Sequence, residues 1–188
     1  RAEFFKYMDA ANIDLKGFTE RFYKKICLSE LAPVLETLIY LKHETSVWFE
    51  ITTLLIPGEN DSEKELNEMT EWIVEKLGTD VPIHFSAFHP DFKMQDIPRT
   101  PHSTLIMARD IALKNGIQYA YVGNVHDFDR ESSYCPNCNE LLIGRDWYVL
   151  SDWNMKNGSC KYCQTKIPGV FEDSPGTWGS KRMRVKMS

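Results

Sequence analysis

The chain has 188 residues, 43% hydrophobic and 26% charged, with a formal net charge of −5. This length provides for one core of ordinary size and a small additional unit. An acidic chain lacks the basic surface of a general nucleic-acid-binding protein, and no apolar run approaches the roughly 18 residues that cross a bilayer. Residues 1–10 lack the apolar core of a secretion signal, so we expect a cytoplasmic protein.

Strand-like and helix-like runs alternate along the chain up to about residue 124. The helices are recognised by apolar residues at helical spacing, and the strands by β-branched and aromatic residues. Ser62 with Glu65 three residues later is the pattern of a capping box. Predicted strands span 11–16, 47–57, 82–90 and 117–125, and predicted helices begin at Pro33, Ser62 and about Ser103.

Single helices between successive strands predict parallel pairing through right-handed crossovers. The fold class is therefore α/β, as a small open sheet or as a segment of a parallel (β/α) barrel. Four strands cannot close an eight-stranded barrel of about 250 residues. Because the chain opens on Arg1 and enters ordered-looking sequence at once, we expect it to be the back half of something larger.

The character of the sequence changes between about residues 127 and 133, where the alternation of strands and helices ends. We assign 1–126 to the barrel segment, 127–171 to a four-cysteine unit and 172–188 to a basic tail. The tail carries Lys181, Arg182, Arg184 and Lys186.

Four of the five cysteines form two CxxC pairs, Cys135 with Cys138 and Cys160 with Cys163, separated by 21 residues. This spacing favours a structural four-thiolate zinc site in a reducing compartment. An iron–sulfur cluster, a redox dithiol pair and unligated core cysteines are the alternatives. A closed site has no open position for catalysis, so the metal is expected to hold together a unit of about 40 residues. Cys27 stands alone and is expected to be a packed side chain.

Polar residues share one face near the ends of the predicted strands, where α/β proteins bind ligands. On the first strand, alternation places Asn12, Asp14 and Lys16 together. Asp14 and Lys16 either face a barrel mouth or form a surface ion pair. Asn124 after Gly123 suits the same rim, although a turn explains both equally well.

The second and third strands repeat this pattern. Glu50 and Thr52 alternate with buried positions on the second strand, and His84 and Ser86 do so on the third. His89 ends the third strand and begins a polar loop, although a structural histidine is the alternative. The three strands together predict one shared site, whereas residues 58–61 form a turn without a functional signature.

Several segments, taken in order, resemble the C-terminal half of one family of enzymes. They are DAANIDLKGFTERFYKK, PVLETLIYLK, ITTLLIPGENDSEKEL, HFSAFHPDFKM, YAYVGNV and the cysteine pairs, and they cover residues 3–171. The family is the AmmeMemoRadiSam group of radical S-adenosylmethionine (SAM) enzymes, relatives of the pyruvate formate-lyase activating enzymes. Its fold is a partial (β/α)6 barrel.

The resemblance implies a reductive cleavage of SAM at a [4Fe–4S] cluster to a 5′-deoxyadenosyl radical that abstracts hydrogen from a substrate. It implies that Lys16 contacts the SAM carboxylate with Asp14 nearby, and that His89 lies near the ribose. Glu50 stands where an activating enzyme carries arginine. The expected cofactor-binding residues are Asp14, Lys16, Glu50, Thr52, Ser86 and His89. The family's cluster motif, CxxxCxxC, is absent from this sequence, so the chain is expected to be inactive alone.

A second class of function stays open, in which the cysteine unit and basic tail form a non-catalytic module that recruits a protein or nucleic-acid partner. The short tail and the acidic chain argue against it. No membrane partner is expected, and nucleic acid is disfavoured. An open barrel edge predicts that the chain self-associates.

Overall fold

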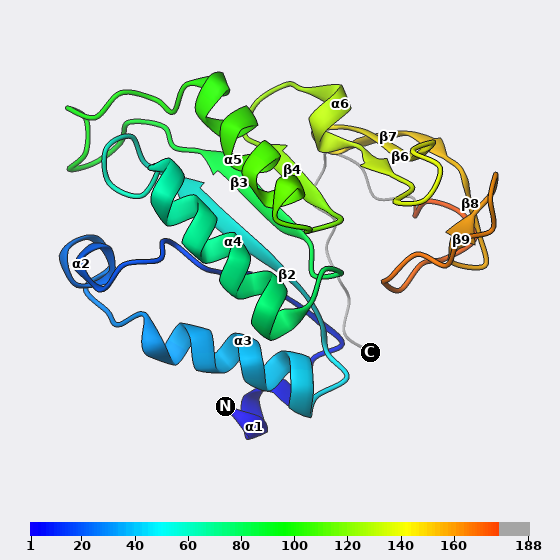
Figure 1. The fold of residues 1–188 in the computed structure, drawn as a ribbon, viewed down its shortest axis with the longest axis horizontal. Helices are drawn as coiled ribbons and strands as arrows, with labels where there is room; N and C mark the ends of the chain where they lie inside the picture. Colours follow the sequence, from blue (N-terminus) through cyan, green and yellow to red (C-terminus); the bar gives the residue numbers. More distant parts are fainter. Residues whose placement is uncertain (177–188) are drawn as a thin grey trace, which may run out of the picture. The chain divides into compact units, whose positions relative to one another are not determined.

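The computed structural model describes residues 1–176, so the basic residues predicted for the tail lie outside the described part. The chain divides into two compact units between Val125 and His126. Within the described residues, no helix has both the length and the apolar character needed to span a membrane. Each unit is considered by itself below (Figure 1).

The first unit is built on a four-stranded parallel sheet in the order β1-β2-β3-β4. The strands are β1 (Ala10–Asp14), β2 (Trp48–Leu55), β3 (Ile83–Ala87) and β4 (Ala120–Gly123). The helices between them are α3 (Ala32–Glu44), α4 (Glu63–Leu77) and α5 (His102–Lys114). Because neighbours in the sheet are also neighbours in sequence, right-handed crossovers place all three helices on one side (Figure 1).

Burial alternates strictly along these strands. In β2 the residues Phe49, Ile51, Thr53 and Leu55 are buried, and the residues between them are only partly covered. The buried set packs with the helices into a single hydrophobic core, which includes Leu38 and Leu66 at 0% exposure. Among the described residues of the first unit, none of the helices α3, α4 and α5 covers the opposite face of the sheet. The predicted α/β class and parallel partial-barrel arrangement are thereby confirmed.

The predicted elements are present, with boundaries that differ at several ends. The first strand stops at Asp14, so Lys16 lies beyond it and not within it. The side chain of Ser62 caps α4 by accepting a hydrogen bond from Glu65 N at 3.3 Å. The capping box is wrong in its other half, because the Glu65 carboxylate instead accepts from Phe18 N at 2.6 Å. A tertiary contact has taken the side chain that the local pattern assigned to the helix end.

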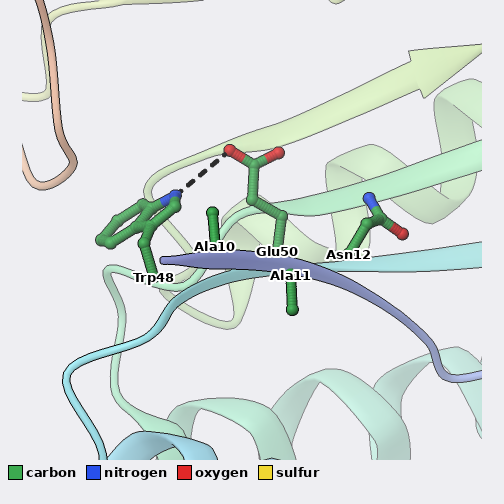
Figure 2. A pocket seen from close by; sticks show the side chains of 5 residues that line it. All are labelled: Ala10, Ala11, Asn12, Trp48 and Glu50. Carbon is green, nitrogen blue, oxygen red and sulfur yellow. Dashed lines mark hydrogen bonds between the residues drawn. The ribbon is translucent and has the colours of Figure 1, made fainter. Parts of the chain in front are cut away.

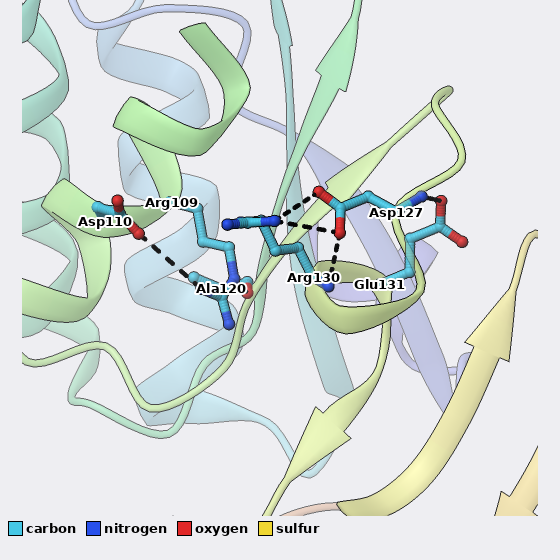
Figure 3. A network of polar contacts seen from close by, with 6 residues as sticks. All are labelled: Arg109, Asp110, Ala120, Asp127, Arg130 and Glu131. Carbon is cyan, nitrogen blue, oxygen red and sulfur yellow. Dashed lines mark hydrogen bonds and ion pairs between the residues drawn. The ribbon is translucent and has the colours of Figure 1, made fainter. Parts of the chain in front are cut away.

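Short helices near the N-terminus were not predicted. They are α1 (Ala2–Phe5), α2 (Glu20–Phe22) and the π-helix η1 (Tyr23–Cys27). Leu28, in the left-handed region at φ 51°, ends this segment. In the same unit, Arg109 Nε donates to Ala120 O at 2.9 Å and ties α5 to the start of β4 (Figure 3).

The second unit begins with α6 (Phe128–Glu131), whose N-cap Asp127 accepts from Arg130 N and forms an ion pair with its guanidinium (Figure 3). A three-stranded antiparallel sheet follows, in which β6 and β7 form a hairpin between the cysteine pairs. Its strands are β5 (Ser133–Tyr134), β6 (Leu141–Asp146) and β7 (Val149–Trp153). A two-stranded ribbon, β8 (Met155–Lys156) and β9 (Ser159–Cys160), precedes the last cysteine.

Candidate metal centre and sheet-face site

The four cysteines of the CxxC pairs converge in the second unit. Their Sγ atoms all lie within 4.8 Å of one another. Cys135 and Cys163 are 3.5 Å apart at Sγ, and Cys138 and Cys160 are 3.7 Å apart. A tetrahedral zinc with Zn–S bonds of about 2.3 Å separates its sulfurs by about 3.8 Å. The thiolates therefore fit one four-coordinate ion, whereas a cluster of several irons needs a wider arrangement.

The two cysteine pairs are held by identical local structures. Cys135 N donates to Glu140 O at 2.9 Å, and Cys160 N donates to Thr165 O, also at 2.9 Å. The residue after the second cysteine, Asn139 or Gln164, is in the left-handed region and donates its N–H to the first cysteine's carbonyl. Each pair therefore forms a tight knuckle that turns both sulfurs toward the same point.

In the first unit, the uncovered face of the sheet carries the polar residues predicted for a shared site. The strand register sets Asp14, Thr52, His84 and Tyr121 side by side in one row. Glu50 lies two residues before Thr52 on β2 and therefore on the same face. The predicted alternation is therefore correct on β1, β2 and β3, and the row adds Tyr121 of β4, which was not predicted.

Glu50 and His84 form a specific pair within this face. His84 Nε2 lies 2.6 Å from Glu50 Oε2, and the imidazole stacks on Tyr121 with centroids 4.9 Å apart. The other carboxylate oxygen, Oε1, is 3.5 Å from Trp48 Nε1. Both oxygens of the Glu50 carboxylate therefore have a nitrogen-bearing side chain close by, His84 and Trp48. No local pattern predicted this contact, because the two residues are 34 positions apart.

Glu50 also borders a shallow hollow of about 290 Å³ beside β1 (Figure 2). The hollow is lined by Ala10, Ala11, Asn12, Trp48 and Glu50. The small Ala10 side chain lies on the same side of the sheet as the Trp48 ring and the Glu50 carboxylate, whereas the Ala11 side chain points to the other side (Figure 2). It is an open depression on the uncovered side of the sheet.

At the carboxyl end of β1, Lys16 Nζ lies 3.0 Å from Asp14 Oδ2, with side-chain exposures of 40% and 54%. Ser86 lies beside Gly123 in the register, and His89 is exposed beyond the end of β3. Lys16 and Asp14 are therefore brought together, while no contact joins His89 to them among the described residues. Asn124 Nδ2 donates to Ala87 O, at the end of β3, at 3.2 Å.

The backbone around Lys16 is held by side chains that sequence reasoning missed. Tyr23 Oη accepts from Lys16 N at 3.0 Å, and its burial raises its pKa to about 12, so the phenol stays neutral. Asn60 donates to Lys16 O at 2.5 Å. Asn60 belongs to the 58–61 turn, and its contact with Lys16 could not be predicted because the two residues are 44 positions apart. Cys27 packs against the core, and burial raises the pKa of its thiol.

Comparisons with known proteins support the fold. No family model matches this sequence. An uncharacterized protein of Methanocaldococcus jannaschii, MJ0808, is 43% identical over 168 residues, which are 87% of this chain and 49% of that protein. The chain thus spans about half the length of this curated relative. A crystal structure of a domain of pyruvate-formate lyase-activating enzyme from Bacteroides vulgatus superposes with a TM-score of 0.56 at 19% identity, covering 65% of this chain and 71% of that domain.

Proposed function

We propose that this chain is the cofactor- and substrate-binding half of a radical SAM enzyme of the activating-enzyme type, within the AmmeMemoRadiSam group. The observation that carries the proposal is the uncovered polar face of a parallel β/α sheet, with Asp14 and Lys16 at the carboxyl end of its first strand. The fold shared with the activating-enzyme domain supports it. Ligands of such sheets bind where the strands end.

Each polar residue has a role in this proposal. Lys16 Nζ binds the carboxylate of SAM by a charge-assisted hydrogen bond, with Asp14 beside it to hold the ammonium in place. Thr52 and Ser86 offer hydroxyls, and His89 is expected at the ribose. Glu50, held by His84, stands where activating enzymes carry an arginine. Its carboxylate accepts hydrogen bonds from hydroxyl or amino groups of the bound molecule.

The iron–sulfur cluster finds no ligands in this chain. Its CxxxCxxC motif is absent, and the four clustered cysteines form closed knuckles spaced for a single ion. The cluster ligands are therefore proposed to come from protein sequence outside this chain. When bound, the cluster would supply the electron for the reductive cleavage of SAM. The residues of this chain bind and orient SAM and the substrate. This chain alone is proposed to be inactive.

The test uses the full-length protein encoded by the gene, including any sequence upstream of the Arg1 codon. We expect a CxxxCxxC motif within the preceding hundred or so residues, because about half a barrel has this length. Lys16→Ala should weaken SAM binding in anaerobic calorimetry by roughly 10- to 100-fold, the effect of a charged hydrogen bond. Lys24→Ala, which removes the same charge from an exposed position of η1, should leave SAM affinity unchanged. Unaltered SAM affinity in Lys16→Ala would refute the assignment.

A second candidate function is partner recruitment by the cysteine unit. The turn of the β6–β7 hairpin exposes three large side chains, Trp147 at 46%, Tyr148 at 65% and Val149 at 60%. Apolar residues gathered on a surface are typical of contact sites. Deleting residues 127–188 from the full-length protein discriminates the two functions, because loss of partner binding with intact SAM cleavage would favour recruitment.

A further inference from the structure

We infer that Asn60 is a positioning residue for Lys16, acting through the backbone and not through contact with a ligand. This inference rests on the proposed function, in which Lys16 binds the SAM carboxylate. It adds a residue from a turn that separates β2 from α4, and that residue belongs to no predicted site. The contacts around residues 15–18 carry the argument.

The backbone from Leu15 to Phe18 leaves the sheet after β1, yet its polar groups are bonded by side chains from four other segments. We call these four side chains the Lys16 clamp. Thr53 Oγ1 donates to Leu15 O at 2.8 Å, Tyr23 Oη accepts from Lys16 N at 3.0 Å, Asn60 Nδ2 donates to Lys16 O at 2.5 Å, and Glu65 Oε1 accepts from Phe18 N at 2.6 Å.

Asn60 makes the most contacts of the four. It is 2% exposed, and its Nδ2 also donates to Leu54 O at 2.9 Å while its Oδ1 accepts from Ile56 N at 2.7 Å. Both amide hydrogens are thus used, one on each of the two strand ends. A single buried side chain therefore ties the residue after β1 to the last residues of β2.

The consequence for Lys16 is that its N–H and its C=O are both fixed while its side chain stays partly exposed. The ammonium reaches Asp14 and is 40% exposed on the side chain. When Lys16 binds a ligand, its long side chain loses rotamer freedom. Because the backbone of Lys16 is already fixed, binding costs no further backbone entropy. Buried, fully bonded polar networks give a rigid local structure of this kind.

The test compares two probes in the full-length protein, SAM and decarboxylated SAM. The dissociation constant of decarboxylated SAM divided by that of SAM reports only the contribution of the carboxylate, and a larger ratio means a larger contribution. Lys16→Ala should lower that ratio toward one, because the two probes should then bind with similar affinity. Asn60→Asp, which keeps Oδ1 but replaces the donor with oxygen, should lower the ratio by about tenfold, because small displacements of a binding group are costly.

Two further variants keep the test decisive. Tyr23→Phe removes only the oxygen that accepts from Lys16 N, so it should lower the ratio even if Asn60→Asp does not fold. Thr70→Val removes another fully buried hydroxyl, one that bonds within α4 and to Asn115, away from Lys16. It should leave the ratio unchanged.

The outcomes separate the inference from the proposed function. If Asn60→Asp and Tyr23→Phe weaken both probes equally, the clamp has only a structural role and the inference is overturned. If Lys16→Ala itself leaves the ratio unchanged, the assignment of Lys16 to the carboxylate fails, and the inference fails with it. A ratio lowered by Lys16→Ala, Asn60→Asp and Tyr23→Phe, but not by Thr70→Val, supports the positioning role.

Discussion

Loss of the metal from the four-cysteine site is expected to unfold the second unit and leave the first intact. Cys160 is fully buried among the four sulfurs, and Cys160→Ser removes one of the four ligands. Between residues 126 and 176, the described part of the second unit, the buried large aliphatic side chains are Leu142, Ile143, Met155 and Ile167. These contribute about 2 kcal/mol each, whereas a structural zinc contributes about 10–16 kcal/mol.

The first unit should be unaffected, because its core is made of residues between Phe5 and Val125. The matched control is Cys27→Ala, which removes the fifth cysteine without touching the metal site. Elemental analysis should find one zinc per chain in the unaltered protein and in the control, and none in Cys160→Ser.

Hydrogen exchange measured by mass spectrometry gives the structural outcome. Amides of residues 133–167 should lose protection in Cys160→Ser or after treatment with a strong chelator, while β2 and β3 keep theirs. Full protection of residues 133–167 after the metal has been removed would refute the reasoning, because the remaining apolar burial would then suffice. Stoichiometric iron with sulfide, in place of zinc, would refute the single-ion geometry.

Other predictions concern the first unit. Burial raises the pKa of Glu65 above its ordinary value of 4.5 and outweighs the hydrogen bond from Phe18 N, which lowers this pKa. Because the folded state holds the proton more tightly than the unfolded state, the wild-type protein should lose stability as pH rises through the folded-state pKa. Glu65→Gln keeps the acceptor for Phe18 N and should lack that loss in urea unfolding; equal pH profiles would contradict this. A double-mutant cycle on the half-exposed Glu50–His84 pair should give a coupling of about 1 kcal/mol or less, and a value above about 2 kcal/mol would be inconsistent with solvent screening. Because β1 pairs on one side only among the described residues, light scattering should show a mass that rises with concentration, and a constant monomer mass would count against an adhesive edge.

Much of the fold follows from local patterns in the sequence. The start of the helix after Ser62 was predicted correctly, because its N-terminal cap is a local signal. The alternation that places Glu50 and Thr52 on one face followed from the two-residue period of a strand.

The contacts that define the candidate site do not follow from local patterns. Glu65 fits a capping box by sequence, yet its carboxylate bonds Phe18 N, 47 positions away. Asn60 looks like an ordinary turn residue until the ends of β1 and β2 meet around it. Side chains of this kind have several chemically equivalent partners, and only the folded backbone selects one.

The sequence by itself determined the α/β alternation, the cysteine knuckles and the set of polar residues at the strand ends, because each depends on neighbours a few positions apart. The tertiary structure decided which of those residues meet. Parallel register set Asp14, Thr52, His84 and Tyr121 in one row, and the placement of all three helices on one side left that row uncovered. Register and crossover hand are properties of the assembled sheet, so no single segment of the sequence carries them.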